Sequence, residues 1–465
     1  MGIKQLMHLL NEKAATSVDK LPLEAFAGQV IACDASMAIY QFILALMQQN
    51  KQGLGVLTNE SGRVTAHLVG LLSRNIQFLQ AGIKPIWVFD GKPPEMKEVA
   101  LSKRRENKNK AKEALSEAQE AVMPDLPHSQ IPHSQVVNSV PRKRLKTEEV
   151  DEDENAWSLA IKRQAIMKKK YSETVVEIEQ NFKTRLERIV GGPIPAISSP
   201  DYCCHGESDM EAGGDFAEIS DIINSLERRG FEDMQSVHKQ AMKSIHISKS
   251  MFDDAKKLIT LLGLPVINAP AEAEAQCAAL VKAGIASAVA SEDMDALTFG
   301  AEVLLRGFNS KKEPIVRIQL SKAMELLSLT YEEFVDLCIL MGCDYTSTIE
   351  GVGPATAIKL INQCSRLEAV LDYVKTQPRF KIPEDFEYIG ARQLFFEAET
   401  IDPLTIRLRW AQADTSGLYE FLVTHRGFSP NRVNGCIKRL LKTYKEPTQS
   451  KIDKFFASPK VKNEA

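Results

Sequence analysis

Cysteine and histidine are scarce in this chain of 465 residues, which contains eight of each. The cysteines lie at irregular spacings without a CxxC pair and without histidine partners at metal-ligand spacing, which argues against a zinc site. Cys203 and Cys204 are adjacent, which suits neither a zinc knuckle nor a disulfide framework. We therefore expect reduced, intracellular thiols.

Long apolar runs are also missing. No segment approaches the roughly 20 apolar residues that a membrane-spanning helix needs. The start Met1-Gly2-Ile3 is not followed by the apolar region of a signal peptide, and Leu6 stands where a myristoylation signal has Ser or Thr. The sequence therefore predicts a soluble intracellular protein without a membrane partner.

Neither sign of charge dominates, because 58 Lys and Arg residues face 61 Asp and Glu residues, for a formal net charge of −3. A nucleic-acid enzyme with an acidic metal centre and basic arms fits this balance, but so do many other enzymes. Total charge therefore decides nothing about function. The length exceeds that of a usual single domain and is sufficient for a large core.

Three short apolar runs share one feature, an acidic residue at their end. Residues 30–33 lead into Asp34, residues 85–89 lead into Asp90, and residues 286–290 lead into Ser291, Glu292 and Asp293. Helical patterns separate them, for example at 68–79 and 275–282. Strands that alternate with helices predict an α/β fold with a mostly parallel central sheet flanked by helices. Ligands of such sheets bind beyond the carboxyl ends of the strands.

A compositional break interrupts this pattern between about residues 121 and 221. It contains Pro- and Ser-rich stretches, a basic run at 141–146 and an acidic run at 148–154. Residues 157–190 are highly charged with helical spacing. We interpret the whole segment as a largely disordered insertion that holds one charged helix.

Seven carboxylates are candidates for one site, and each also has a structural explanation of its own as a helix cap, a turn residue or a solvated charge. They are Asp34, Asp90, Glu272, Glu274, Asp293, Asp295 and Asp344. Together they would converge on one edge of the sheet, where unpaired carboxylates raise each other's pKa values. Oxygen ligands without His or Cys favour magnesium or manganese, and two such ions about 4 Å apart form the clamp used in phosphoryl displacement. No Ser-His-Asp or Cys-His arrangement competes with this interpretation.

Two further features accompany the acids. Gly351 and Gly353 with Pro354 form the turn of a helix-hairpin-helix pattern, which brings backbone N–H groups close to a phosphate. Lys97 and Arg104 are seven residues apart on a predicted helix and so project from one face. They could neutralise a scissile phosphate, although a solvated basic face explains them equally well.

The C-terminal tail contains an apolar triad in polar surroundings. Ile452, Phe455 and Phe456 follow Gln449 at spacings that place all three on one helical turn. Such side chains at a polar terminus favour a peptide that docks into a partner's groove.

These segments closely resemble the flap endonucleases of the XPG/Rad family of structure-specific nucleases. The matching stretches are MGIKQL at the start, DASMAIYQF at 34–42, GIKPIWVFDGKPP at 82–94, APAEAEAQCAALVKAG at 269–284, ASEDMDALTFG at 290–300 and FVDLCILMGCDYTSTIEGVGP at 334–354. The resemblance covers residues 1–118 and about 222–456. It implies an N-terminal nuclease domain at 1–120 and an insertion at 121–221 within a helical cap or arch. An internal nuclease domain with the helix-hairpin-helix at 222–367, a C-terminal helical region at 368–443 and a tail at 444–465 would follow.

The resemblance also implies roles for individual residues. Two magnesium ions, which manganese can replace, would be held by Asp34, Asp90, Glu272 and Glu274 and by Asp293, Asp295 and Asp344. Lys97, Arg104 and Asp293 would be catalytic. Residues that contact DNA would be Tyr40, Arg74, Glu272, Gly342, Asp344, Gly351 and Gly353. Gly2, with the initiator Met removed, would lie near the active site, and a monovalent cation would assist the hairpin.

The implied substrate is flapped duplex DNA, cut near its junction by a 5′ flap endonuclease with 5′→3′ exonuclease activity. The implied context is Okazaki-fragment maturation and long-patch base-excision repair in the nucleus, including nucleoplasm and nucleolus, with mitochondrial use open. The motif at 449–456 resembles one that docks on the sliding clamp, proliferating cell nuclear antigen, and the chain alone is expected to be monomeric. Two alternatives remain: a related exonuclease or junction resolvase, and a clamp-bound DNA-binding factor without catalysis.

Three departures from the family pattern matter. Met47 stands where the family usually has Arg, with Lys51 as a candidate substitute. The Lys-rich extension after the clamp motif is reduced to Lys460 and Lys462. The insertion falls between the two cap helices, where we expect it to loop outward, because the entropy cost of loop closure rises slowly with length. Its basic run fits a nuclear import signal and, almost as well, a solvated charge run.

Overall fold

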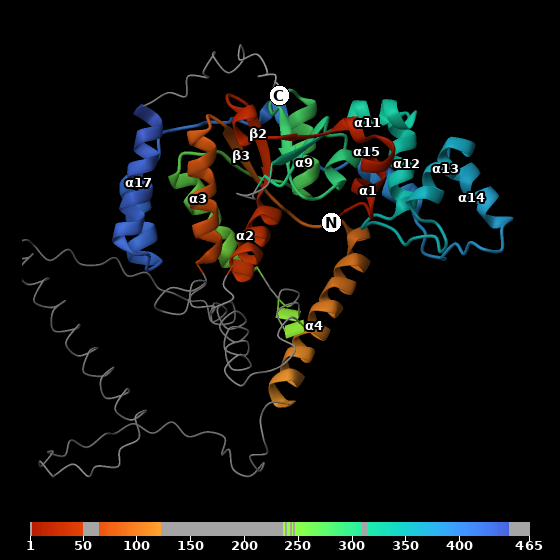
Figure 1. The fold of residues 1–465 in the computed structure, drawn as a ribbon, viewed down its shortest axis with the longest axis horizontal. Coiled ribbons are helices and arrows are strands. Elements are labelled where there is room, and N and C mark those ends of the chain that lie inside the picture. Colours follow the sequence, from red (N-terminus) through yellow and green to blue (C-terminus); the bar gives the residue numbers. More distant parts are fainter. Residues whose placement is uncertain are drawn as a thin grey trace, which may run out of the picture. The chain divides into compact units, whose positions relative to one another are not determined.

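The apolar runs that end on acids form neighbouring strands of one sheet in the computed structural model of the chain (Figure 1). The structure describes residues 2–49, 65–121, 247–308 and 314–445, together with 236, 237, 240, 241 and 244. The insertion beyond residue 121 and the tail with its clamp motif lie outside the described residues, as do Lys51, Lys460, Lys462 and the side chain of Met47.

Seven strands make up the sheet in the described part of the chain, in the order β1-β7-β6-β5-β2-β3-β4. They are β1 (Val18–Leu21), β2 (Val30–Asp34), β3 (Lys84–Phe89), β4 (Val266–Asn268), β5 (Ala288–Ala290), β6 (Val303–Arg306) and β7 (Ile315–Gln319). The five strands from β6 to β4 are parallel, whereas β7 runs antiparallel to β6 and to β1. The predicted mostly parallel sheet is confirmed.

The main helices before the insertion are α1 (Leu6–Lys13), α2 (Ala35–Gln49), α3 (Ala66–Gln80) and α4 (Glu98–Ala121). Those after it are α8 (Lys249–Leu261), α9 (Ala273–Lys282), α10 (Asp295–Thr298), α11 (Leu320–Leu327), α12 (Tyr331–Met341), α13 (Pro354–Cys364), α14 (Leu367–Lys375), α15 (Tyr388–Phe396), α16 (Thr415–Tyr419) and α17 (Pro430–Lys445). Short turns of 3₁₀-helix lie at Ala15–Ser17, Leu23–Phe26, Glu95–Lys97 and Pro403–Thr405, and a π-helix spans Glu420–His425.

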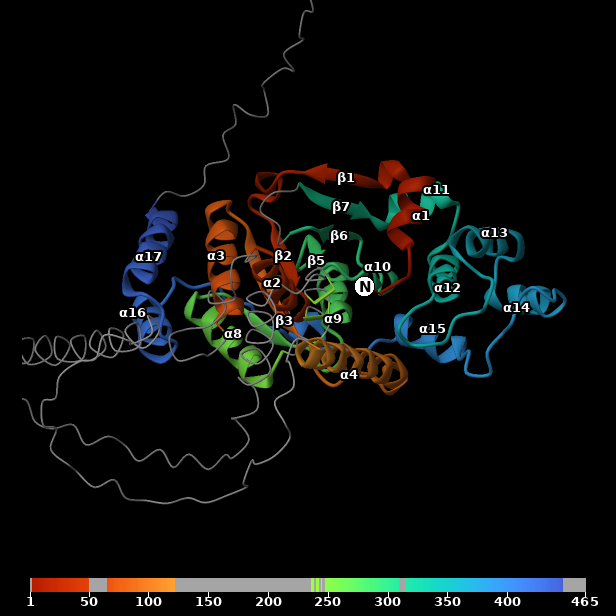
Figure 2. The same ribbon diagram turned by 60° about the horizontal axis from the view of Figure 1, so that its bottom comes forward.

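Both faces of the sheet are covered, because alternate residues of each strand enter different cores. On β3, Ile86 and Val88 face a core shared with α1, α9 and α12, while Trp87 and Phe89 face a second core with α2, α3 and α8. Figure 2 shows α3, α8 and α17 on one side of the strands and α12 to α15 on the other. Helices therefore flank a buried sheet, as predicted.

The helix-hairpin-helix prediction rests on the segment between α12 and α13. Helix α12 starts with a capping box formed by Thr330 and Glu333 and ends at Gly342, whose φ of 106° favours glycine. The chain then turns through Gly351, at φ 87°, to Gly353, which precedes Pro354 at the start of α13. These turns fit the predicted pattern, and its role as a grip on DNA stays a prediction.

Candidate active site

The seven carboxylates are supplied by the ends of parallel strands and by the segments that follow them. Asp34 is the last residue of β2, Asp90 comes directly after β3, and Asp293 follows β5 by three residues. Because β5, β2 and β3 are adjacent and parallel, their carboxyl ends meet at one edge of the sheet. We call the seven residues the acidic cluster.

Helix starts hold several of these acids in place. Glu272 is the N-cap of α9, and Glu274 lies in its first turn. Asp90 accepts a hydrogen bond on Oδ1 from the backbone N–H of Ala273 at 2.8 Å, and Asp34 accepts one from Met37 at 3.0 Å. Asp34 and Asp90 therefore also cap the helices α2 and α9, where a helix N-terminus favours negative charge. Both interpretations of these residues are therefore correct, because they cap helices and also belong to the acidic cluster.

Ser291 connects the two halves of the acidic cluster. Its hydroxyl donates to Asp34 Oδ2 at 2.8 Å and accepts from the backbone N–H of Asp293 at 3.0 Å. Asp293 in turn accepts from the backbone N–H of Asp295 at 3.1 Å, and Asp295 opens the short helix α10. The buried Oδ1 of Asp295 has no hydrogen-bond partner, so one carboxylate oxygen is left for a ligand to satisfy.

Burial makes the negative charge of the acidic cluster costly. Asp34, Glu272, Glu274, Asp293 and Asp295 are exposed by only 2 to 9%. Burial and then the charge of Asp90 raise the pKa of Asp34 to about 7. Burial and neighbouring carboxylates raise the pKa of Glu274 and of Asp295 well above the usual carboxyl range. The pKa values of Glu272 and Asp293 also rise, chiefly through burial.

Two basic side chains reach the acidic cluster from the base of α4. The ammonium of Lys97 binds Glu272, and the guanidinium of Arg104 binds Asp344. Burial alone would lower the pKa of Lys97, but the carboxylates of Glu272 and Glu274 raise it overall. Lys97 therefore stays charged at neutral pH, and both basic side chains lie where a phosphate would approach the acids.

Tyr345 contacts both partners of the Lys97–Glu272 ion pair. Its buried hydroxyl donates to Glu272 Oε2 at 3.2 Å, and Lys97 Nζ lies 6.0 Å from the centre of its ring. Burial and the charges of Asp295 and Glu272 raise the pKa of Tyr345 well above its usual value, so it remains a hydrogen-bond donor.

The N-terminus closes the site on another side. Gly2 has φ 70°, and a Cβ there would lie 1.8 Å from Asp293 Oδ1 and 2.5 Å from Asp295 Oδ1. Gly2 therefore lies beside the acidic cluster, which fits the prediction of its place near the active site. Lys4 fixes this segment, because its backbone N–H donates to the carbonyl of Gly342 at 3.1 Å.

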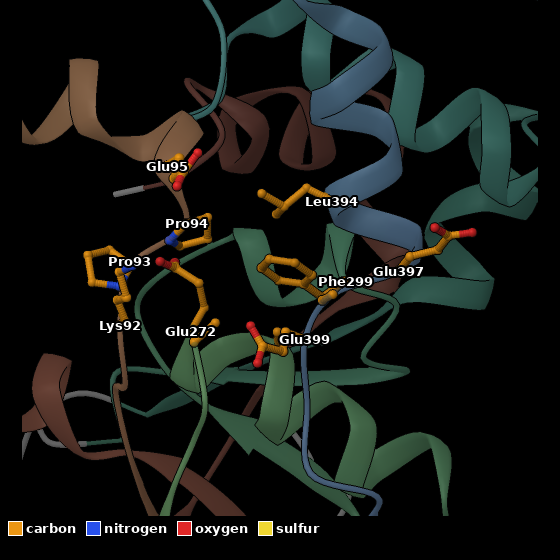
Figure 3. A pocket seen from close by; sticks show the side chains of 12 residues that line it. Lys92, Pro93, Pro94, Glu95, Glu272, Phe299, Leu394, Glu397 and Glu399 are labelled. Atoms are coloured by element: carbon orange, nitrogen blue, oxygen red, sulfur yellow. The ribbon is translucent and has the colours of Figure 1, made fainter.

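Two depressions open beside the cluster. A cleft of about 690 Å³ runs from Asp344 along Arg104 and Lys103 to Lys381 and is large enough for part of a nucleotide strand. A pocket of about 370 Å³ lies behind Glu272. Figure 3 shows the Glu272 carboxylate directed toward Pro94, with Phe299 and Leu394 across the pocket.

The chemistry of the acidic cluster fits a divalent cation. All seven donors are hard carboxylate oxygens, their mutual repulsion raises several pKa values, and one buried oxygen of Asp295 has no partner. Among the described residues, no group of three or more His, Cys, Asp or Glu side chains is arranged so that it could hold a metal ion as it stands. Lys97 and Arg104 occupy two of the carboxylates instead.

The remaining predicted DNA contacts lie outside the acidic cluster. Tyr40 is half-buried on α2, and Gly351 and Gly353 lie in the turn before α13. Arg74 is only 4% exposed, donates to Gln77 at 3.0 Å and packs over the ring of Phe78. Their contacts with DNA stay predictions, as does that of Gly342, where a Cβ would lie 2.5 Å from Thr348.

Two supporting residues escape sequence reasoning. Ser291 and Tyr345 stand inside motifs that we singled out, yet nothing in their spacing marks them as partners of Asp34 and Glu272. Only the fold shows these contacts, which join residues 257 and 73 positions apart.

Comparison with known proteins defines the class first. The XPG N-terminal domain matches residues 1–111, and the XPG I-region matches residues 263–344. All seven members of the acidic cluster fall within these two regions, and Asp344 is the last residue of the second match. The chain therefore contains both of the regions that define XPG-type proteins.

Full-length relatives narrow the class. Flap endonuclease 1 of Tetrahymena thermophila is 35% identical over 464 residues, which span 98% of this chain and 92% of that protein. Flap endonuclease 1 of Caenorhabditis elegans is 33% identical over 98% of this chain and 91% of its own length, and that of Glycine max is 34% identical over 99% and 93%. The chain belongs to the flap endonuclease family.

Solved structures agree on the fold. Flap endonuclease-1 from Methanococcus jannaschii matches with a TM-score of 0.52 at 20% identity, over 92% of this chain and 96% of that one. The catalytic core of Rad2 in complex with DNA substrate matches with a TM-score of 0.55 at 17% identity, over 94% of this chain and 100% of that one.

In the described ranges, no helix has both the length and the apolar character to cross a membrane.

Proposed function

We propose that this chain is a structure-specific 5′ flap endonuclease that hydrolyses DNA phosphodiester bonds and also has 5′→3′ exonuclease activity. The observation that carries the proposal is the convergence of seven carboxylates beneath Lys97 and Arg104 at the base of α4. Family membership supports flapped duplex DNA as the substrate. The alternatives are a related 5′→3′ exonuclease or junction resolvase and a clamp-bound DNA-binding factor without catalysis, and the assay below separates them.

We further propose that the cofactor is magnesium, two ions per chain, with manganese as a substitute. Asp34, Asp90, Glu272 and Glu274 would hold one ion, and Asp293, Asp295 and Asp344 the other. When bound, such ions supply positive charge to the attacking and leaving oxygens of an in-line displacement.

The chain's own basic residues then have a defined task. Lys97 and Arg104 would exchange their carboxylate partners for the scissile phosphate and neutralise its charge. Tyr345 keeps Glu272 oriented while Lys97 moves, since its hydroxyl bonds the same carboxylate. The hairpin at 351–353, assisted by a monovalent cation, would hold the uncleaved duplex through backbone N–H groups.

A cleavage assay tests the activity. Purified protein is incubated with a 5′-labelled double-flap DNA, a blunt duplex and a four-way junction, with and without magnesium. Flap-length products that need magnesium support the proposal. Mononucleotides from the blunt duplex as the main product favour an exonuclease, junction cutting favours a resolvase, and cutting of none favours the binding factor.

The Asp293→Ala variant tests the role of the acidic cluster in the same assay. It should lose cleavage while largely keeping flap binding, because Asp293 is a buried member of the acidic cluster, 7% exposed, and offers little surface to the bound DNA. Turnover near the wild-type rate would refute the assigned ligand set.

For the biological setting, we propose DNA replication and repair in the nucleus, with the sliding clamp as a partner through Gln449, Ile452, Phe455 and Phe456. The motif resemblance supports this docking. Replacing Phe455 and Phe456 together with Ala should remove stimulation by the clamp and leave clamp-free cleavage unchanged. Equal stimulation of this variant and the wild type would refute it.

A further inference from the structure

Helix α15 contacts the 3₁₀ turn Glu95–Lys97, which leads into α4 and carries Lys97. A Cβ on Gly390 would lie 3.0 Å from both Sδ and Cε of Met96, so Met96 rests on this face of α15. Met96 directly precedes Lys97, which binds Glu272. A small movement of α15 would therefore shift Met96 and, with it, the ammonium of the adjacent residue Lys97.

The same helix is fastened to α12 and α14 by one arginine. Arg392 donates from Nε to Asp336 Oδ1 at 2.7 Å and from its terminal nitrogen to Oδ2 at 2.9 Å. It also donates to Glu368 Oε1 at 2.8 Å. Asp336 is 4% exposed and additionally accepts from the backbone N–H of Leu367, the first residue of α14. A bidentate pair with a buried carboxylate fixes orientation as well as distance.

The segment after α15 is tied to the helix that carries two of the acids. The buried side chain of Gln276 on α9 accepts from the backbone N–H of Ile401 at 2.7 Å and donates to its carbonyl at 3.0 Å. Gln276 lies one turn from Glu272. Helix α15 and the segment that follows it therefore contact the turn Glu95–Lys97, helix α9 and the helices α12 and α14.

We propose that Arg392 is a positioning residue for cleavage, an inference that rests on the proposed function. By locking α15 onto α12 and α14, Arg392 keeps Gly390 beneath Met96 and so keeps Lys97 over the acidic cluster. Without its guanidinium, Asp336 is left buried and unpaired, which loosens the attachment of α15. The Lys97 ammonium then samples positions away from the scissile phosphate.

The test is a double-mutant cycle on flap DNA. Arg392→Gln should slow single-turnover cleavage by about tenfold or more, since small misplacement of a catalytic group is costly. The dissociation constant of the flap, measured without divalent metal, should change by less than about threefold. Combined with Lys97→Ala, Arg392→Gln should add no further loss, because both act through one side chain. Arg409→Gln, the same change at an exposed arginine, is the control and should keep the wild-type rate.

A structural role alone would give a different result. Losses that multiply in the double variant, or weaker flap binding in proportion to the lost rate, overturn the inference. Met96→Ala breaks the contact with α15 but spares the ion pairs, so it decides the question if Arg392→Gln does not fold; a wild-type rate in Met96→Ala overturns the inference. Failure of the wild-type protein to cut the flap would instead overturn the proposed function.

Discussion

Gly2 shows how closely a single residue can approach the chemistry. Its α-carbon lies against the carboxylates of Asp293 and Asp295, at a backbone φ of 70° that favours glycine. Neither property follows from composition or periodicity. The next residue but one, Lys4, is held by the carbonyl of Gly342, so the chain start is part of the site.

Gly2→Ala should lower flap cleavage by about tenfold or more, since its methyl group must displace the N-terminal segment or the Asp293 carboxylate. The rate is measured under single-turnover conditions. Gly284→Ala is the matched control, because Gly284 has φ 71° with no atom within 4 Å of the added carbon. Control and Gly2→Ala losing activity equally would mean that backbone strain, and not crowding of Asp293, is responsible.

His67 is a buried titratable residue away from the acidic cluster. Its ring is fully buried on α3, neither ring nitrogen has a hydrogen-bond partner, and burial lowers its pKa from 6.5 to about 4. Between about pH 6.5 and pH 4, His67 is therefore protonated in the unfolded chain but neutral in the folded chain. Folding stability present above pH 6.5 is lost as the pH falls through this window.

His67→Leu should flatten the acid side of the stability profile. Within this window, the unfolding free energy of the wild type should fall by about 1.4 kcal/mol per pH unit because of His67, the value for one proton, and the variant should not show this decrease. Urea denaturation at several pH values measures it. The exposed His425→Gln variant is the control, and an unchanged slope in His67→Leu would contradict the prediction.

At the scale of the elements, prediction from sequence succeeded where a local pattern matched a buried strand. The apolar runs before Asp34 and Asp90 formed β2 and β3 as expected, because a central parallel strand is apolar on both faces. The third predicted run, at 286–290, formed β5, although that strand has only three residues. Strand β4 has three residues as well, and β1 at the sheet edge reads Val-Asp-Lys-Leu, so these two strands were too short or too polar to stand out in the sequence.

The acids of the candidate site could be predicted for the same reason, since the carboxyl ends of parallel strands must meet. Their partners could not be predicted. The contacts of Ser291 with Asp34, of Tyr345 with Glu272 and of Gly390 with Met96 depend on how distant segments pack. Such contacts have no sequence period.

The insertion is the element on which the sequence departs most from the family. Deleting residues 124–218 and joining the ends by a short Gly/Ser linker should preserve flap cleavage within about threefold, because loop closure depends weakly on length. The side chains that reach the acids, Lys97 and Arg104, lie just before α4 and in its first half, about 20 or more positions before residue 124 in the sequence. Cleavage and thermal unfolding are measured in parallel. Lost cleavage in a deletion protein of wild-type stability would place the insertion in the path of the flap.

At the scale of the whole molecule, the site is a stability liability that a cation would relieve. Segments from Asp34 to Asp344 bring carboxylates together that repel each other, and burial prevents water from screening them. The fold tolerates this because two large cores cover both faces of the sheet. Folding and cation binding must therefore be linked.

Magnesium should raise the thermal midpoint of the protein, since an ion that binds only the folded state adds about 2.7 kcal/mol of stability at a hundred times its dissociation constant. Asp295→Asn should raise the midpoint of the magnesium-free protein, because it removes a buried carboxylate. Burial and the charge of Asp293 raise the pKa of this carboxyl, which shows that its charged form is unfavourable in the fold. The same variant should lose much of the magnesium-dependent increase. Asp372→Asn, at a carboxylate whose side chain is 81% exposed, should change neither value. Calorimetry with magnesium or with a chelator measures both. A full magnesium-dependent increase in Asp295→Asn would show that the ion stabilises the protein at another place, and Asp295 would lose its role as a ligand.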